Sequence, residues 1–211
     1  LDKGYEIGSV GTVMPDLEVK IGENNEILLR GKTITTGYYK KPEATAAAID
    51  KDGWFHTGDA GYLKGNHLYL TERIKDLFKT SNGKYISPQA LETKLSIDRY
   101  IDQIAVIADQ RKFVSALIVP VYGLVKNYAK EKGLEYKDMA DLLQHPKVQA
   151  LFRARIDTLQ QQFAHYEQVK RFTLLSEPFS MERGELTNTL KLKRSVVAKN
   201  YKELIDKMYE E

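Results

Sequence analysis

The spacing of apolar residues changes near residue 73 of this 211-residue chain. Before that point, short stretches of alternating apolar and polar residues are separated by turns rich in Gly, Asn and Asp, a pattern typical of antiparallel strands. The alternating stretches are 18–21, 27–30, 62–63 and 67–70, and the turns lie at 22–25, 50–53 and 64–66. The first third of the chain is therefore expected to be rich in β-structure.

Beyond residue 73 the pattern predicts a mixture of strands and helices. Residues 77–86 predict a hairpin that turns at Ser81-Asn82-Gly83. Ser87 and Pro88 are expected to begin a helix, because Ser satisfies free backbone amides at a helix start and Pro fits the first helical position. Further strands are expected at 103–108, 114–121 and 169–175.

Two helices are expected to meet at Pro146, one ending before it and one beginning there. The second of these, and the last helix of the chain, carry apolar residues at three- and four-residue steps, which predicts one buried stripe on each. The first stripe comprises Val148, Leu151, Phe152, Ile156, Leu159 and Phe163, and the last comprises Val196, Val197, Tyr201, Leu204, Ile205 and Met208. The predicted fold class is α+β.

The composition, 42% hydrophobic and 29% charged residues, is that of an ordered soluble protein. The lack of cysteine excludes disulfides and thiolate sites, and a net charge of +3 is too small to indicate a nucleic-acid partner. The longest uncharged apolar run, 113–125, is interrupted by Pro and Gly and is shorter than the ~20 residues that cross a bilayer. Because the chain opens on Leu, without a basic-then-apolar leader, we expect a piece of a longer protein that carries no secretion signal here.

The segment Gly53–Asp59 places an acidic side chain after a glycine turn. A carboxylate fixed there can accept hydrogen bonds from two neighbouring hydroxyls, as on a ribose, and such charge-assisted bonds contribute about 1.5–3 kcal/mol each. Taken alone, Thr57-Gly58-Asp59 is more often a hairpin turn in which the acid caps backbone amides.

A second segment, Glu72–Lys84, alternates charged and apolar residues as an edge strand does and then turns. Its Arg73 offers a planar fork of donors that suits a nucleotide. Taken alone, the segment is more often a solvent-exposed strand whose ion pairs add little stability.

A third segment, Gly184–Arg194, is a loop that brings several cations to the start of the final helix. A lysine in such a loop can stabilise a phosphate or carboxylate whose charge changes during a reaction. Taken alone, it is a common basic helix start.

In this order and spacing, the three segments resemble signature motifs of the adenylate-forming superfamily, which includes acyl-CoA synthetases, firefly luciferase and peptide-synthetase adenylation domains. Further matching stretches are 8–15, 31–39 and 41–45, so the resemblance covers almost the whole chain. Residues 82–88 and 186–194 resemble the long-chain fatty acid–CoA ligase branch, and the helical stretch 122–166 is longer than in short-chain relatives. Thr189-Leu190-Lys191 stands where most other members have Ser-Gly-Lys.

The resemblance implies roles in adenylate formation for four residues. Asp59 would bind both ribose hydroxyls of ATP, and Arg73 would contact the same nucleotide. Lys191 would be the catalytic residue that contacts substrate oxygens while the acyl-adenylate forms. Lys75 would be the hinge about which a C-terminal domain rotates between the two half-reactions.

For the later CoA step, the resemblance implies Lys79 and the loop of Asn82, Gly83 and Lys84, which differs in length and sequence from the commoner pattern. The superfamily's phosphate loop ending in Pro-Lys-Gly and its Tyr-Gly-x-Thr-Glu motif for adenine and magnesium are not in this sequence. Both, like the acyl pocket, are expected before Leu1. The implied cofactors are ATP, CoA and Mg²⁺, with no metal site in these residues.

The resemblance implies two domains. Residues 1–72 would be the closing β-subdomain of the large adenylating domain, and 73–211 the small mobile α+β C-terminal domain. The intact enzyme would be a long-chain fatty acid–CoA ligase that binds a fatty acid, ATP and CoA, works with its own N-terminal domain and binds no nucleic acid. The chain alone is expected to be inactive. A cytoplasmic location is expected, with peripheral membrane attachment of the intact enzyme left open.

Two alternatives remain open from the sequence. The first is an adenylating relative with another acid or another acceptor, such as an acyl-carrier protein. The second is a non-catalytic binding module, for instance for RNA through the basic tail. That module would need interleaved basic and aromatic residues, whereas the basic residues near the C-terminus alternate with aliphatic ones.

Overall fold

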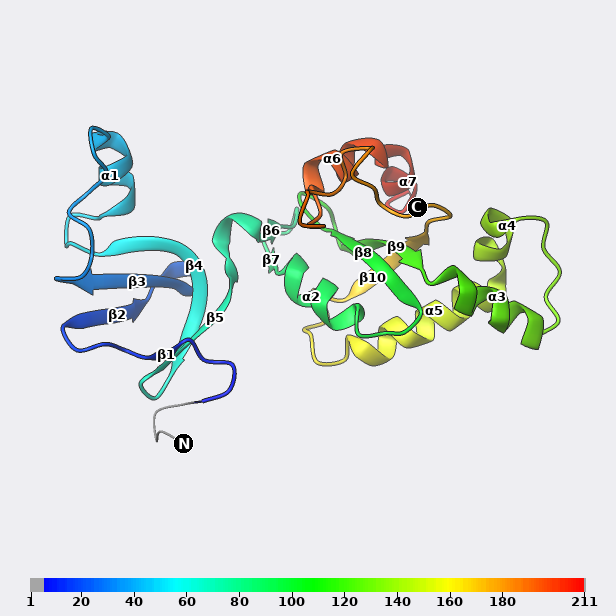
Figure 1. Cartoon of the computed structure of the whole chain (residues 1–211), viewed down its shortest axis with the longest axis horizontal. Helices are drawn as coiled ribbons and strands as arrows, with labels where there is room; N and C mark the ends of the chain where they lie inside the picture. Colours follow the sequence, from blue (N-terminus) through cyan, green and yellow to red (C-terminus); the bar gives the residue numbers. More distant parts are fainter. Residues whose placement is uncertain (1–5, 211) are drawn as a thin grey trace. The chain divides into compact units, whose positions relative to one another are not determined.

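The computed structural model describes residues 6–210, and its helices and strands divide between two compact units. The first unit ends at Leu77 and the second begins at Phe78 (Figure 1). Each unit has its own main sheet. The mixture of helices and strands confirms the predicted α+β class.

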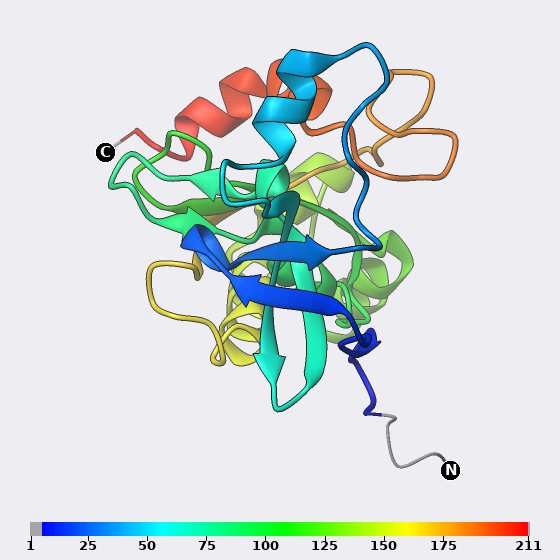
Figure 2. The ribbon, with the colours of Figure 1, turned by 90° about the vertical axis from the view of Figure 1, so that its left-hand side faces the viewer.

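The sheet of the first unit has the strand order β1-β5-β4-β3-β2. Its strands are β1 (Gly11–Thr12), β2 (Leu17–Ile21), β3 (Glu26–Gly31), β4 (Phe55–Lys64) and β5 (His67–Arg73). All four ladders between them are antiparallel, which confirms the predicted pairing. Figure 2 shows β2 beside β3 and β4 beside β5.

Short helical segments complete the first unit. They are the 3₁₀ turns η1 (Glu23–Asn25) and η2 (Ile74–Asp76) and the helix α1 (Pro42–Ala48). Helix α1 begins at Pro42 and has Glu43 in its first turn, and both residues favour a helix start. The hydrophobic pattern did not predict α1, because a helix of two turns is too short to show a repeat.

The sequence predicted one edge strand from residue 72 to residue 79, but the structure interrupts that strand at the end of the first unit. Strand β5 ends at Arg73, η2 follows, and the chain becomes extended again only at Leu77. A hydrogen bond from Leu77 N to Ile74 O, 3.2 Å long, closes this turn. Alternation of charged and apolar residues is also compatible with a single 3₁₀ turn between two short strands, so it did not reveal the interruption.

The second unit is built on a three-stranded sheet in the order β10-β9-β8. The strands are β8 (Ile101–Ile107), β9 (Val114–Pro120) and β10 (Val169–Leu174), and a separate hairpin is formed by β6 (Phe78–Lys79) and β7 (Tyr85–Ile86). The helices are α2 (Pro88–Leu95), α3 (Tyr122–Glu131), α4 (Met139–Gln144), α5 (Pro146–Leu159), α6 (Arg194–Asn200) and α7 (Lys202–Lys207). The predicted hairpin, strands and helix junction at Pro146 are confirmed.

Strand β9 is buried along its whole length, because helices cover both faces of its sheet. Its alternate residues Val114, Ala116 and Ile118 pack with apolar residues of α2, α3, α4 and α5. Leu117 and Val119 point to the other face and pack with α6 and α7. Figure 1 shows α6 and α7 on the side of the sheet opposite α5.

The two predicted helix stripes have different outcomes. On α5, Val148, Phe152 and Ile156 are fully buried, as predicted, but Phe163 lies beyond the end of the helix. The predicted final helix is two helices, α6 and α7, because Tyr201 between them leaves the helical conformation at φ −105° and ψ 20°. The Tyr201 ring meets Phe179 edge-on at 5.7 Å, which gives this residue a packing role of its own.

Ser87 caps α2 as predicted, because its side-chain oxygen accepts a hydrogen bond from Ala90 N at 3.1 Å. Ser87→Ala is expected to destabilise the second unit by about 1 kcal/mol, since Ala90 N loses its acceptor. Hydrogen exchange of the most protected β9 amides measures this free energy. Ser96→Ala, at the other end of α2, is the control and should change it by less than about 0.5 kcal/mol. Equal effects of the two substitutions would contradict the capping role.

No helix among residues 6–210 has the length and apolar character needed to cross a membrane.

Candidate functional site

Asp59 lies within β4. The backbone of β4 is irregular next to this residue, where hydrogen bonds to β3 replace the regular pairing. Gly58 has a φ of 70°, which glycine adopts without strain, and its N–H donates to Glu26 Oε1 at 3.0 Å. Thr57 Oγ1 donates to Ile27 O at 2.7 Å and accepts from Asp59 N at 3.1 Å. The predicted tight turn is therefore wrong: the segment is an irregular part of a long strand, shaped by its neighbour β3.

Asp59 and Arg73 face each other across β4 and β5. Arg73 Nε lies 3.2 Å from Asp59 Oδ1, and the arginine side chain is 72% exposed against 31% for the aspartate. Because an exposed ion pair contributes little stability, both groups can turn to a ligand at small cost. The pair offers an acceptor for hydroxyls beside a cationic fork of donors.

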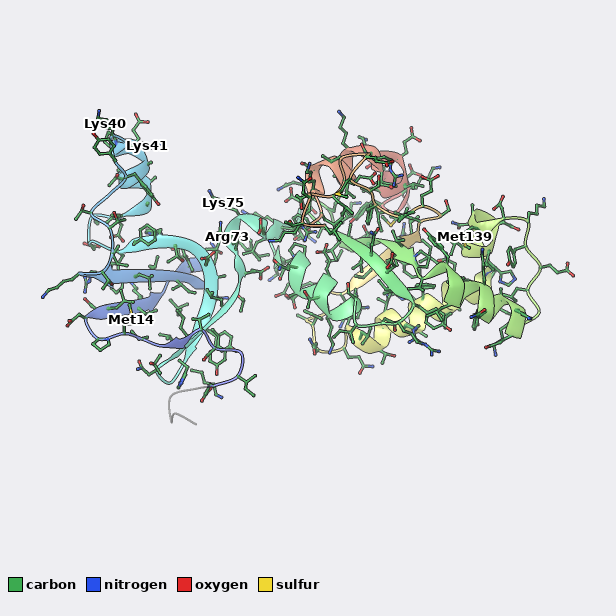
Figure 3. All side chains as sticks on the ribbon, in the orientation of Figure 1. Met14, Lys40, Lys41, Arg73, Lys75 and Met139 are labelled. Atoms are coloured by element: carbon green, nitrogen blue, oxygen red, sulfur yellow. The ribbon has the colours of Figure 1, made fainter. Side chains whose placement is uncertain are left out.

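Lys75 lies in η2, outside both main sheets, and its side chain is exposed. Figure 3 labels Arg73 at the end of β5 and Lys75 on the segment that follows. A backbone hydrogen bond from Leu77 N to Ile74 O closes the turn. The hinge role of Lys75 stays a prediction.

Lys79 and the loop Asn82–Lys84 lie together on the β6–β7 hairpin, with Lys79 in β6 and the loop at the tip. Backbone hydrogen bonds fix the hairpin to the loop between β8 and β9: Gln110 N donates to Lys79 O at 2.8 Å, and Ser81 N donates to Arg111 O at 3.0 Å. The side chains at the tip are exposed. The hairpin is thus held at its base and open to a ligand at its tip.

Lys191 lies on an exposed loop just before α6. Thr187 N donates to Lys191 O at 2.8 Å, and Lys191 N donates to Thr187 Oγ1 at 3.0 Å, so the lysine closes a narrow loop. Leu190, in the position where the resemblance places a glycine in most members, has a φ of 60°. This is the left-handed region that favours glycine. Leu190 therefore adopts the backbone conformation that a glycine would adopt at this position.

The second unit contains a cavity of about 330 Å³ between the hairpin, the end of β8 and α6. Its lining includes Phe78, next to Lys79, and Leu192, next to Lys191. Arg194 also lines it and forms two hydrogen bonds of 2.5 Å to Glu92 of α2, which fixes the start of α6. The hairpin and the Lys191 loop therefore each contribute a residue to the lining of one cavity.

The described part of the chain offers no cluster of three His, Asp or Glu side chains that could hold a metal ion. The magnesium site that the resemblance implies is expected before Leu1 and stays a prediction.

The structure thus brings Asp59 and Arg73 together, and it groups Lys79 with residues 82–84. One residue to which the sequence patterns assigned no role is Glu185, whose side chain is fully buried beneath the Lys191 loop. A lone Glu in a polar loop gives no local signal of burial, because the hydrophobic pattern does not show that Ser180, Arg183 and Asn200 surround its carboxylate.

The comparisons with known proteins identify the family. Residues 75–211 match the AMP-binding enzyme C-terminal domain, and the chain therefore belongs to the AMP-binding enzyme family. This confirms the resemblance found in the sequence.

Similar proteins include long-chain acyl-CoA synthetases and ligases. The chain is 34% identical to the peroxisomal long chain acyl-CoA synthetase 6 of Arabidopsis thaliana, covering 100% of this chain and 33% of that protein. It is 32% identical to a long-chain fatty-acid–CoA ligase of Mycobacterium tuberculosis, covering 97% of this chain and 34% of the relative. The chain thus spans about a third of the length of the relatives that it matches.

Solved structures with a similar fold include the adenylation domain of a carboxylate reductase from Mycobacterium chelonae. Its TM-score is 0.68 at 24% identity, covering 98% of this chain and 34% of that one. The O-succinylbenzoate coenzyme A synthetase of Bacillus subtilis, in complex with AMP, gives a TM-score of 0.56 at 22% identity, covering 90% of this chain and 35% of that one. At these identities the similarity establishes the fold alone.

Proposed function

We propose that the complete protein is a long-chain fatty acid–CoA ligase that forms AMP. In the first half-reaction a fatty acid carboxylate attacks the α-phosphorus of ATP, the bond to pyrophosphate breaks, and acyl-AMP remains. In the second, the CoA thiol attacks the acyl carbon and AMP leaves. The catalytic principle is the positioning of reactants and the stabilisation of developing charge.

The observation that carries the nucleotide part of the proposal is the pairing of Asp59 with Arg73. Their side chains meet across β4 and β5, and the Asp59 carboxylate is partly exposed beside the more exposed Arg73. Two ribose hydroxyls match one carboxylate, while the exposed guanidinium suits the rest of a nucleotide. The long-chain acyl part rests on the names of the relatives, which include fatty-acid–CoA ligases from plants, bacteria and mammals.

The remaining residues receive roles in the same scheme. Lys191 contacts substrate oxygens during adenylation, Lys75 is the hinge, and Lys79 with Asn82–Lys84 serves CoA transfer. The residues up to 72 belong to the large adenylating domain, and those from 73 form the mobile domain. ATP phosphates, magnesium and the fatty acid are bound by residues outside this chain, and the intact enzyme lies in the cytoplasm or at a membrane surface.

A second candidate is an adenylating enzyme with another acid or acceptor. It is favoured by the fold similarity to adenylation domains of carboxylate reductases, one of which was solved with its carrier-protein domain. In that case acyl-AMP would form normally, but CoA would not be the acceptor.

The test is pyrophosphate release by the complete protein with ATP and a panel of acetate, octanoate, palmitate and benzoate, followed by acyl-CoA analysis. Palmitate is expected to give the largest kcat/KM, and palmitoyl-CoA should accumulate. The 211-residue chain alone is expected to release no pyrophosphate above a no-enzyme control. Preference for acetate or benzoate, or adenylation without CoA transfer, would overturn the proposal.

A further inference from the structure

Glu185 is a buried carboxylate at the base of the loop that carries Lys191. Its side chain is 1% exposed, whereas Lys191 is exposed to solvent. A charged side chain is rarely buried without partners, because the cost of removing it from water is large. A group of donors around Glu185 must therefore compensate for that cost.

Three residues supply those donors. Ser180 N donates to Oε2 at 3.0 Å, and Asn200 Nδ2, on α6, donates to Oε1 at 3.1 Å. Arg183 Nε donates to both oxygens at 3.1 and 3.2 Å, and its Nη2 lies 3.0 Å from Oε2. The carboxylate thus joins the loop before it to the helix after it.

The ionisation of Glu185 agrees with this geometry. Burial alone would raise the pKa of the carboxyl, but the hydrogen bonds from Arg183, Ser180 and Asn200 outweigh burial and lower the pKa below its usual value. The group is therefore charged at neutral pH, and its charge-assisted hydrogen bonds are the strong kind.

The loop connects Glu185 to Lys191 through a short ladder of backbone pairs. Lys193 N donates to Glu185 O at 2.8 Å, Leu186 pairs with Leu192, and Thr187 pairs with Lys191. Leu186 and Leu192 pack on the core that α6 and α7 cover. Lys191 and Lys193 are both exposed, whereas Leu192 between them packs on that core.

We infer that Glu185 is a positioning residue for Lys191: its carboxylate fixes the base of the 185–193 ladder, so that the lysine is presented in one orientation during adenylate formation. The inference rests on the proposed function for its kinetic consequence. The structural part, that the order of the loop depends on the Glu185 carboxylate, stands on the contacts alone. A lysine held in place loses less conformational entropy when it binds the reacting oxygens.

The first arm of the test is hydrogen exchange in the 211-residue chain with Glu185→Gln, which keeps the shape of the side chain and removes its charge. Exchange at the amides of Lys191 and Lys193 is expected to accelerate about 10-fold, while β9 amides stay unchanged. Glu177→Gln is the matched control, because Glu177 also pairs with Arg183, at 3.3 Å, but its side chain is 75% exposed. It should change neither set of amides.

The second arm is kinetic and uses the complete enzyme. Glu185→Gln is expected to slow acyl-AMP formation about 10-fold and to leave CoA transfer from supplied acyl-AMP unchanged. Asn200→Ala, which removes one donor from an exposed residue of α6, should show the same selectivity with a smaller loss. It serves as the second variant if Glu185→Gln folds poorly.

Each outcome decides the inference. Local loosening with a selective loss of adenylation supports it. Equal loss in both half-reactions, or faster exchange in β9 as well, would show that Glu185 only stabilises the fold. If neither the exchange rates nor the half-reactions change, Glu185 does not position Lys191. If the wild-type enzyme forms no acyl-AMP from any acid, the proposed function has failed, and the exchange arm alone then decides whether Glu185 orders the loop.

Discussion

Lys191→Ala in the complete enzyme is expected to slow acyl-adenylate formation by roughly 100-fold or more, the loss seen when one donor to a developing negative charge is removed. Lys191 is exposed, and its loop is closed by backbone bonds to Thr187 that the substitution leaves in place. The loss should therefore come from the missing ammonium group. Pyrophosphate release with palmitate measures this half-reaction.

CoA transfer from supplied palmitoyl-AMP should remain nearly normal in Lys191→Ala, because the proposed rotation of the C-terminal domain would by then have moved the lysine away from the acyl group. Lys193→Ala is the matched control. Lys193 is also exposed on the same loop, and its hydrogen bond to Glu185 is made by the backbone, which alanine retains. Both half-reactions should stay close to wild type in that variant. Equal losses in both half-reactions of Lys191→Ala would show that the lysine is structural.

Lys75→Pro is expected to separate the half-reactions in the opposite sense. Proline fixes φ at about −65° and disfavours the helical conformation of the residue before it, here Ile74 within η2. A rotation about this position would then be restricted to one orientation, which we propose is the adenylating one. Adenylation should survive within about tenfold, whereas CoA transfer should fall by about 100-fold.

Stopped-flow measurement of each half-reaction checks this expectation, with Lys75→Ala as the control for loss of the side chain. Alanine leaves φ and ψ free, so both half-reactions should remain near wild type. If proline slows both alike, or if alanine behaves as proline does, the pivot lies at another residue.

The sequence predicted those elements whose cause is local. The hairpin at 77–86, the Ser87 cap and the buried stripe of α5 each follow from residues close together in the chain. The antiparallel pairing of the first unit followed from alternation and turn residues in the same way.

The failures have their causes elsewhere in the chain. The backbone at Gly58 is set by Glu26 on the next strand, so a turn was predicted where a strand continues. The final helix breaks at Tyr201, whose ring packs on Phe179. The sequence pattern predicts an exposed Glu185, because it does not show that Arg183 and Asn200 bind its carboxylate. Hydrophobic periodicity contains none of this information, because each case depends on a contact between separate segments.

The parallel pairing of β10 with β9 has a consequence for biosynthesis. In the first unit, β2 to β5 pair with their neighbours in sequence, and such local pairings form quickly. Strand β9, in contrast, can pair with β10 only after α3, α4 and α5 have been synthesised. Its other face can be covered only later, when α6 and α7 have been synthesised. Closing so long a loop is slow, and during that interval β9 exposes apolar side chains on both faces. We therefore expect the nascent chain to be most prone to aggregation between the emergence of β9 and that of α7.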